Sequence, residues 1–408
     1  MKTVVFAGGG TGGHIYPGLA VADELKKLDP ALRIVWFGSS SGRDKEMVCS
    51  NKNEFGLPSA DSFVGIPSGK LRRYFSLNNV LDLFKVIAGF FVSLFYLAKI
   101  KPAAVFSKGG FVSVPPCAAA KVLHIPVYTH ECDFSPGLAT RINSRFASRI
   151  LLSYEESRRF FPEHMRNKLF VTGNPVRPVF YAADAKKGLL FLGLAHTKHK
   201  PILLVLGGSS GARQINNLVF ENLDWLCERF TVVHQTGKGD DFEKARFLAQ
   251  KINGNADIKT NAAAKAEKTA DAVAGDAGRN RYVPYDFIYS DMPDVLSACD
   301  IVFSRSGANT LWESAVCAKP MLLLPLAGSG TRGDQAENAA WFAKRGSAMV
   351  CDSLKDERSL SDEIKSALEK MCDGQFRLSM GKCALKAVGT EKSARKIADM
   401  LYGSINKK

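Results

Sequence analysis

The strongest chemical signal in this chain is a glycine-rich turn that follows a short apolar segment and ends in a histidine. It reads Ala7-Gly-Gly-Gly-Thr-Gly-Gly-His14, and a helix-forming segment comes next. Glycine lets backbone N–H groups approach a phosphate, and the following helix directs its positive end toward that charge. A near-neutral imidazole at this point could remove a proton from a hydroxyl. The alternative for His14 is a helix-start residue that bonds only phosphate or backbone, and the sequence does not decide between the two.

The same turn also matches the dinucleotide fingerprint through Gly8, Gly10 and Gly13. An NAD site needs an acid at the end of the second strand to hold the ribose. Here "RIVWFG" continues into "SSSGRD", with no acid at the strand end. Because Arg43 could instead hold the extra phosphate of NADP, an NADP-dependent oxidoreductase stays open as the alternative function.

Two further motifs, a P-loop and a nucleophile elbow, are not supported by the residues that each would need. A P-loop requires Gly-Lys followed by Ser or Thr, which the chain lacks. Gly207-x-Ser209-x-Gly211 matches a nucleophile elbow, but the only histidine after Ser209 is His234, too close to cross a hydrolase sheet twice. No D-x-D sequence occurs, so a metal-bridged nucleotide-sugar site is not expected, and a bound diphosphate would depend on helix ends and arginine.

Two sets of apolar segments must position these turns. They alternate with helix-period segments, a pattern typical of α/β folds with parallel sheets. The strands are expected at 3–7, 33–37, 103–106, 127–130 and 168–172 in the first set, and at 201–206, 231–235, 301–304 and 321–325 in the second. Each set opens with a strand, a glycine-rich turn and a helix, and "GNPVRP" marks an edge between them. A length of 408 residues also favours two domains.

Two segments interrupt this rhythm. Residues 251–281 are rich in Ala, Lys, Asp and Asn and predict a polar surface insertion. Residues 80–98 are strongly apolar, but the uninterrupted part, 86–98, is too short for a membrane span of about 20 residues. Lysines and arginines flank it at 70, 72, 73, 99 and 101. A helix lying on a membrane with basic anchors and a crossover helix buried in the domain are both open readings.

Composition narrows the class of protein and its surroundings. Apolar content of 46% and charged content of 23% are those of an ordinary globular protein. Nine cysteines without a C-x-x-C pair indicate reduced thiols in a cytosol. The chain runs directly into its first strand, so no signal peptide is expected. A net charge of +15 suits nucleic acid, an anionic membrane surface or phosphorylated substrates.

Several separate stretches, in order, resemble the MurG family of bacterial N-acetylglucosamine transferases, over nearly the whole chain outside 251–281. They are "GGGTGGHIYPGLAVA", "KGGFVSVPPCAAA", "HECDFSPGLATRINSRFA", "GNPVR", "GGSSGARQIN", "YDFIYSDMPDVLSACDIVFSRSGANTLWE" and "RGDQAENA". The resemblance implies a GT-B fold, with two Rossmann-like α/β domains whose parallel sheets face across a cleft. It assigns 1–176 to the acceptor and membrane side and 177–387 to the UDP-sugar, with a helix at about 388–408 packing back on the first domain.

The resemblance also implies the reaction. N-acetylglucosamine would move with inversion from UDP-N-acetylglucosamine to the muramoyl 4-hydroxyl of lipid I, an undecaprenyl-diphosphate-linked muramoyl-pentapeptide. The product would be lipid II, used in peptidoglycan synthesis and so in cell shape and division. The enzyme would work peripherally on the cytoplasmic face of the inner membrane, on an anionic lipid surface, without a metal, another cofactor or nucleic acid.

Site residues carry over from the resemblance position by position. In the second domain, Glu313 would bind the ribose hydroxyls, Ile288 would present its backbone to uracil, and Ser209 would bond a nucleotide phosphate. Arg177 would stabilise negative charge at the nucleotide, or else make an interdomain salt bridge. The start of the "SGANTLWE" helix would face the donor diphosphate, and the substrate-binding residues expected there are Ala308, Asn309, Thr310, Leu311 and Trp312. The "RGDQ" segment would bind the sugar hydroxyls through Asp334 and Gln335.

In the first domain, Thr11, Gly12 and Gly13 would lie near the donor sugar and the acceptor diphosphate. His14 and Glu131 are the candidates for acid–base catalysis. The family commonly has Glu-Gln-Asn where this chain has Glu131-Cys132-Asp133, and an ionised Asp133 beside a diphosphate would be repulsive. Asp133 could bind a sugar hydroxyl or take part in proton transfer instead. Ser210 replaces the usual Gln in the second glycine turn.

Three arginines recur every four residues at 141, 145 and 149. That spacing predicts one basic face on a helix. A lipid-diphosphate acceptor would give this face a role, and a plain solvated surface is the alternative.

Overall fold

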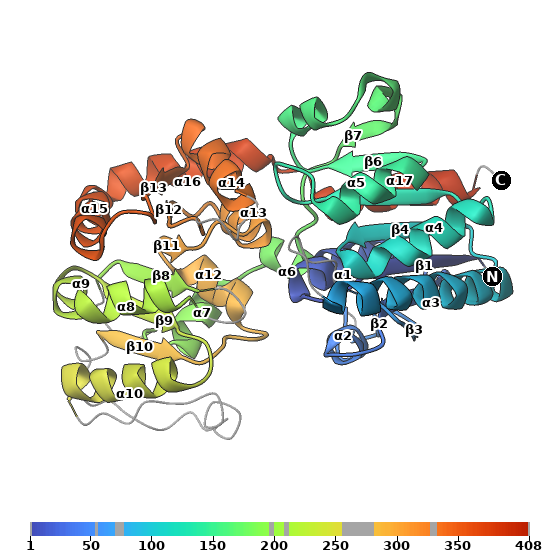
Figure 1. The fold of residues 1–408 in the computed structure, drawn as a ribbon. Helices are drawn as coiled ribbons and strands as arrows, with labels where there is room; N and C mark the ends of the chain where they lie inside the picture. The colour runs from blue at the N-terminus through green and yellow to red at the C-terminus, as the bar shows by residue number, and fades with distance from the viewer. Residues whose placement is uncertain are drawn as a thin grey trace. The chain divides into compact units, whose positions relative to one another are not determined.

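The computed structural model describes residues 2–53, 56–69, 77–195, 200–207, 212–254, 281–326 and 333–406. The chain divides into two compact units (Figure 1). The first combines Met1–Pro178 with the C-terminal segment Glu391–Lys408, and the second is Val179–Thr390. The short helix α6 (Pro178–Tyr181) lies at the boundary.

The first unit is built on a seven-stranded sheet in the order β3-β2-β1-β4-β5-β6-β7, in which every neighbouring pair is parallel. The strands are β1 (Thr3–Gly8), β2 (Arg33–Ser39), β3 (Ser62–Ile66), β4 (Ala104–Gly109), β5 (Val127–Glu131), β6 (Arg149–Leu152) and β7 (Leu169–Val171). The chain runs outward from β1 to β3 and then returns past β1 to β4. In parallel sheets ligands bind at such a reversal, at the carboxyl ends of the strands.

Both faces of this sheet are covered. Along β1, Val4 and Phe6 pack into one apolar cluster, whereas Val5 and Ala7 pack into the other, as the two-residue period of a strand requires. The helical elements are α1 (Gly12–Leu28), α2 (Asp44–Cys49), α3 (Leu77–Ile100), η1 (Phe111–Ser113), α4 (Val114–Val122), α5 (Leu138–Phe146), η2 (Glu155–Phe160), η3 (Glu163–Lys168) and α17 (Ser393–Asn406). The C-terminal helix α17 buries Ile397 and Leu401 in the same cluster as α1.

The second unit repeats this plan with a six-stranded parallel sheet in the order β10-β9-β8-β11-β12-β13. Its strands are β8 (Ile202–Leu206), β9 (Thr231–Gln235), β10 (Tyr282–Tyr285), β11 (Ile301–Ser304), β12 (Met321–Leu323) and β13 (Ala348–Val350). Its helices are α7 (Ala185–Phe191), α8 (Arg213–Glu221), α9 (Leu223–Arg229), α10 (Asp240–Asn253), α12 (Met292–Ala298), α13 (Ala308–Val316), α14 (Asp334–Lys344), α15 (Glu357–Lys370) and α16 (Gly374–Val388). Here the order reverses between β8 and β11.

All nine expected strands are present, with ends shifted by up to three residues. β3, β6, β10 and β13 were not predicted from the sequence. The predicted insertion 251–281 begins inside α10, and its residues 255–280 lie outside the described part of the chain, as does Ser209.

Helix α3 is the segment for which the sequence left two readings open. Small or apolar residues at Gly89, Ser93 and Leu97 are buried, four residues apart on one face. The opposite face is exposed and apolar, with Leu83, Phe84, Ile87, Phe91 and Phe95 between 45% and 65% accessible. The 24-residue helix is longer than the apolar run suggested, and its part Asp82–Ile100 is long and apolar enough to cross a membrane by length and composition alone. Its packing on the first unit instead indicates a helix attached to the domain.

Candidate functional site

The first glycine turn joins β1 to α1 at the point where the strand order reverses. Gly10 has φ +85°, a conformation that favours glycine, and α1 starts at Gly12 after the extended residue Thr11. The backbone N–H of Gly10 donates to both carboxylate oxygens of Asp44, at 3.0 and 2.9 Å. Asp44 is buried and also accepts from the Ser39 N–H at 2.8 Å. This carboxylate therefore fixes the turn against the end of β2.

His14 lies in the first turn of α1, where its backbone N–H donates to the carbonyl of Thr11 at 3.1 Å. Its ring packs against the backbone of Gly109 and Gly110, which follow β4. A Cβ on Gly110 would come 2.8 Å from the His14 Cδ2 and 2.9 Å from the carbonyl oxygen of Gly9. Gly110 thus leaves the space that the imidazole fills. The turns after β1 and β4 together hold the predicted base at the carboxyl ends of these strands.

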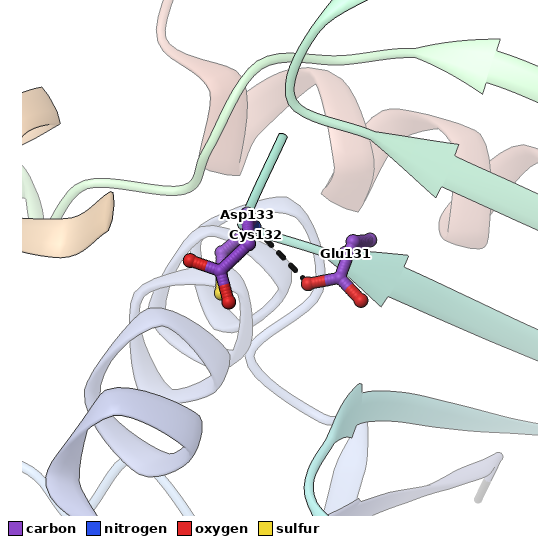
Figure 2. A group of neighbouring side chains, drawn as sticks. All are labelled: Glu131, Cys132 and Asp133. Carbon is purple, nitrogen blue, oxygen red and sulfur yellow. Dashed lines mark hydrogen bonds between the residues drawn. The ribbon is translucent and has the colours of Figure 1, made fainter. Parts of the chain in front are cut away.

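Glu131 ends β5, and Cys132 and Asp133 follow it (Figure 2). One carboxylate oxygen of Glu131 accepts from the backbone N–H of Asp133 at 3.0 Å, and the other accepts from that of Gly137 at 2.9 Å. Glu131 is buried, so it shapes the loop that leads to α5. A carboxylate with both oxygens engaged in this way is a weaker candidate for proton transfer than His14.

The three residues also have the composition of a metal site, since their ligand atoms lie within 4.8 Å of one another. Both oxygens of Glu131 already accept backbone N–H groups. Burial raises the pKa of the Cys132 thiol to about 12, which opposes formation of the thiolate that metals bind. We assign no metal to this group.

Arg177 belongs to the first unit, and its guanidinium lies over the ring of Tyr16 on α1, 5.2 Å from the centroid. A cation above an aromatic face is held by the ring's quadrupole. This places the predicted nucleotide-charge residue beside the helix that carries His14.

The predicted donor residues of the second unit gather at the carboxyl ends of β11 and β12. Gly307 caps α13, and Ala308 is buried at its start. Asn309, Thr310 and Glu313 share the half-exposed face of this helix. Leu311 and Trp312 are buried, so their side chains anchor α13 in the core. The half-exposed face of α13 therefore carries three of the predicted donor residues.

Two further predicted donor contacts are already engaged by neighbouring residues. The backbone N–H of Ile288 donates to the side-chain oxygen of Gln235 at 2.9 Å, and both residues are buried. Gln335, in the first turn of α14 next to Asp334, accepts from the Leu326 N–H at 3.0 Å through its side-chain oxygen. Ile288 and Gln335 are thus each held in a fixed conformation.

The nucleophile-elbow reading receives no support from His234. This residue is fully buried on β9, with its ring nitrogens bonded to the Tyr282 hydroxyl at 2.9 Å and to the Asn216 side-chain oxygen at 3.1 Å. Burial lowers the pKa of His234 to about 3. His234 is a neutral core residue.

The predicted basic face on one helix is wrong, because α5 ends at Phe146 and Arg149 belongs to β6. The Arg149 guanidinium lies 4.9 Å from the centre of the Phe170 ring. Arg141 donates through Nε to the carbonyl of Pro136 at 3.0 Å. Of the three, only Arg145 fits a simple solvated surface role.

Three residues with clear structural roles at these sites were not predicted. Asp44 fixes the first glycine turn, Gly110 makes room for His14, and Gln235 holds the Ile288 backbone. Gly110 stands in the glycine pair "KGGF", which was a detectable signal. Asp44 and Gln235 act on backbone groups distant in the sequence, so no local pattern identifies them.

Family models agree with the two units. The N-terminal domain of glycosyltransferase family 28 matches residues 4–152, and the C-terminal domain of the same family matches residues 202–400. A protein of Treponema denticola named UDP-N-acetylglucosamine–N-acetylmuramyl-(pentapeptide) pyrophosphoryl-undecaprenol N-acetylglucosamine transferase is 48% identical over 403 residues, covering 98% of this chain and 97% of its own. The protein of the same name from Treponema pallidum is 43% identical, over 94% of this chain and 93% of its own.

Solved structures agree on the fold. The crystal structure of MurG from Acinetobacter baumannii superposes with a TM-score of 0.66 at 23% identity, covering 99% of this chain and 100% of its own. A UDP-GlcNAc 2-epimerase from Neisseria meningitidis, bound to UDP-GlcNAc, superposes with a TM-score of 0.61 at 15% identity over the full length of both chains. Both support the GT-B fold expected from the sequence. The NADP-dependent oxidoreductase alternative finds no support among these relatives.

Proposed function

The chain belongs to glycosyltransferase family 28, within the MurG family, and from this premise we propose that it makes lipid II. It transfers N-acetylglucosamine from UDP-N-acetylglucosamine to the muramoyl 4-hydroxyl of lipid I. The observation that carries the assignment to this chain's own residues is the setting of His14. An imidazole held at the start of α1 by the Gly109–Gly110 turn lies where the strand order of the family's N-terminal domain reverses.

The reaction is a single displacement with inversion. The 4-hydroxyl of the muramoyl group attacks C1 of N-acetylglucosamine and loses its proton to His14, while the bond from C1 to the UDP oxygen breaks. A histidine suits this step because imidazole as a side chain can accept a proton near neutral pH. Thr11, Gly12 and Gly13 present the amino end of α1 to the diphosphate of the acceptor.

Residues of the second unit hold the donor. Glu313 accepts hydrogen bonds from the ribose hydroxyls, and Ile288 and Gln235 form the surface for uracil. The amino end of α13, with Asn309 and Thr310, stabilises the charge that develops on the leaving UDP. Asp334 and Gln335 contact the sugar, and Ser209 contacts a nucleotide phosphate.

The exposed face of α3 binds the cytoplasmic leaflet of the inner membrane. Leu83, Phe84, Ile87, Phe91 and Phe95 would enter the lipid. The exposed Lys99, one helical turn after Phe95, suits an anionic surface. Peripheral binding of this kind brings the catalytic unit to a substrate that cannot leave the bilayer.

The test is UDP release from UDP-N-acetylglucosamine with and without a lipid I analogue. We expect release only with the analogue, and a fall of at least about 10²-fold in kcat for His14→Ala. His164→Ala, an exposed histidine on η3, is the matched control and should keep the wild-type rate. Acceptor-independent release, or an unchanged rate in both His14→Ala and Glu313→Ala, would overturn the proposal. UDP-N-acetylglucosamine should also raise the Tm, whereas NADPH should not.

A further inference from the structure

A lysine is buried beside the first unit's glycine turns. In β1, Ala7 pairs with Ser107 of β4 and Gly8 pairs with Gly109, so Lys108 is the extra residue of a β-bulge. Bulges often redirect a side chain beside a functional site. Lys108 is only 2% exposed, and among the residues that the structure describes its Nζ atom meets only the Cys132 thiol, which does not neutralise its charge. A buried ammonium in this state is unfavourable for folding, so its presence calls for an explanation.

The ammonium lies next to the end of β5. Its positive charge helps to lower the pKa of His130 well below the usual range, after the larger effect of burial. It also opposes the rise that burial causes in the pKa of the Cys132 thiol, where Asp133 and Glu131 act in the opposite sense. Lys108 and the two carboxylates thus lie around the same thiol, and carboxylate oxygens approach its sulfur within 4.8 Å.

This arrangement bears on the acidic loop after β5. Glu131 and Asp133 place two carboxylates in the loop after β5, and a Cβ on Gly109 in the turn after β4 would lie 3.8 Å from the carbonyl oxygen of His130, the residue before this loop. A diphosphate would be repelled by them unless a positive charge compensates. Glu131 draws backbone N–H bonds, but these carry no net charge. Lys108 is a buried cation at the thiol that lies between these acids, and low solvent exposure keeps its field unscreened.

We propose that Lys108 is a positioning residue for the acceptor, whose ammonium offsets the charge of Asp133 and Glu131 so that their loop can lie beside a lipid diphosphate. This rests on the proposed function, because it assumes that the first unit takes an anionic acceptor. Lys108 acts through the loop and does not itself touch the reacting atoms. Its cost to folding is then balanced by substrate binding.

The experiment is a double-mutant cycle of Lys108→Met and Asp133→Asn, with Lys187→Met as the matched control. Lys187 is exposed on α7, so its change removes the same charge from the surface. We expect Lys108→Met to raise the KM for the lipid I analogue about tenfold or more and to leave the KM for UDP-N-acetylglucosamine within about twofold. Asp133→Asn in the same chain should recover most of this loss.

The following outcomes would contradict the proposed role of Lys108. An unchanged acceptor KM in Lys108→Met, or a double variant no better than Lys108→Met, overturns it. So does a lower Tm with both KM values raised, which would mark Lys108 as purely structural. Lys108→Gln tests the same point if Lys108→Met does not fold, and failure of both to fold also overturns it. The wild-type protein separates this result from the proposed function, since loss of acceptor-dependent turnover there would refute the function itself.

Discussion

Substituting Gly110 by alanine tests whether the turn after β4 positions His14. Gly110 has φ 76° and ψ 156°, a backbone region that essentially only glycine occupies. Forcing another residue into such a region costs about 1–3 kcal/mol. The added Cβ would also come 2.8 Å from the His14 Cδ2. Carbon atoms normally rest roughly 3.5–4.0 Å apart, so the imidazole must move by about 1 Å.

A matched control separates strain from displacement. Gly389, which ends α16, has φ 74° and ψ 173°, and a Cβ there would meet no atom within 4 Å. Gly389→Ala therefore carries the same backbone strain without touching His14. Both variants should lose about 1–3 kcal/mol of unfolding free energy, which lowers the Tm by roughly 2–4 °C per kcal/mol for a unit of this size.

Activity should distinguish the two variants. A misplacement of about 1 Å near a reacting group can lower the rate roughly 10²-fold. We expect this loss in kcat for Gly110→Ala, measured as acceptor-dependent UDP release, and a near-normal kcat for Gly389→Ala. If both variants keep the same kcat while both lose stability, the turn does not position His14 and the reasoning fails.

Three other predictions follow from the same contacts. Replacing Phe84, Phe91 and Phe95 together by serine should weaken binding to anionic vesicles at least about tenfold in a sedimentation assay, since each exposed ring adds up to roughly 1.5–3 kcal/mol on burial. Phe247→Ser, an equally exposed ring on α10, should leave that binding unchanged. Gln235→Leu leaves the buried Ile288 N–H without its acceptor, so the free energy of unfolding should fall by about 1–3 kcal/mol. The KM for UDP-N-acetylglucosamine should also rise. An unchanged Tm together with an unchanged KM would contradict the role of Gln235 in holding the Ile288 backbone. Burial lowers the pKa values of His130 and His234, so both stay neutral in the folded protein but bind protons in the unfolded chain below their ordinary pKa near 6.5. The free energy of unfolding should therefore fall as the pH drops from about 6.5 toward 3, by about 1.4 kcal/mol per pH unit for each histidine. His234→Gln should reduce that slope when Tm is measured over a series of pH values.

The strands that the sequence predicted and those it missed differ for physical reasons. Buried parallel strands such as β1 and β8 are continuous apolar runs, which makes them visible in the sequence. The missed β3, β10 and β13 are edge strands of three to five residues, with a neighbour on one side only. β10 even contains Pro284, which an edge position tolerates. Their formation depends on a neighbouring strand, so the local pattern is weak.

The site shows the same division. Glycine turns and the positions of His14 and Glu313 follow from local patterns, because a turn and a helix start are local structures. The roles of Glu131 and Leu311 depend on burial and on partners elsewhere in the chain. Glu131 binds two backbone N–H groups, and Leu311 is fully buried. Sequence spacing cannot reveal burial or distant partners. A set of residues chosen by motif therefore includes some that could contact a ligand and others that only hold the local structure.

The first glycine turn shows why a fingerprint alone misleads. Gly8, Gly10 and Gly13 have the spacing of a dinucleotide site, in which backbone N–H groups bind a pyrophosphate. Here the N–H of Gly10 is already bonded to Asp44, and a Cβ on Gly9 would collide with the same carboxylate. A pyrophosphate at that position would have to displace a buried anion. The turn can therefore offer its charge only beyond Thr11, at the amino end of α1. That restriction leaves the amino end of α1, and not the end of β2 where a dinucleotide ribose would bind, as the anion-binding part of the turn.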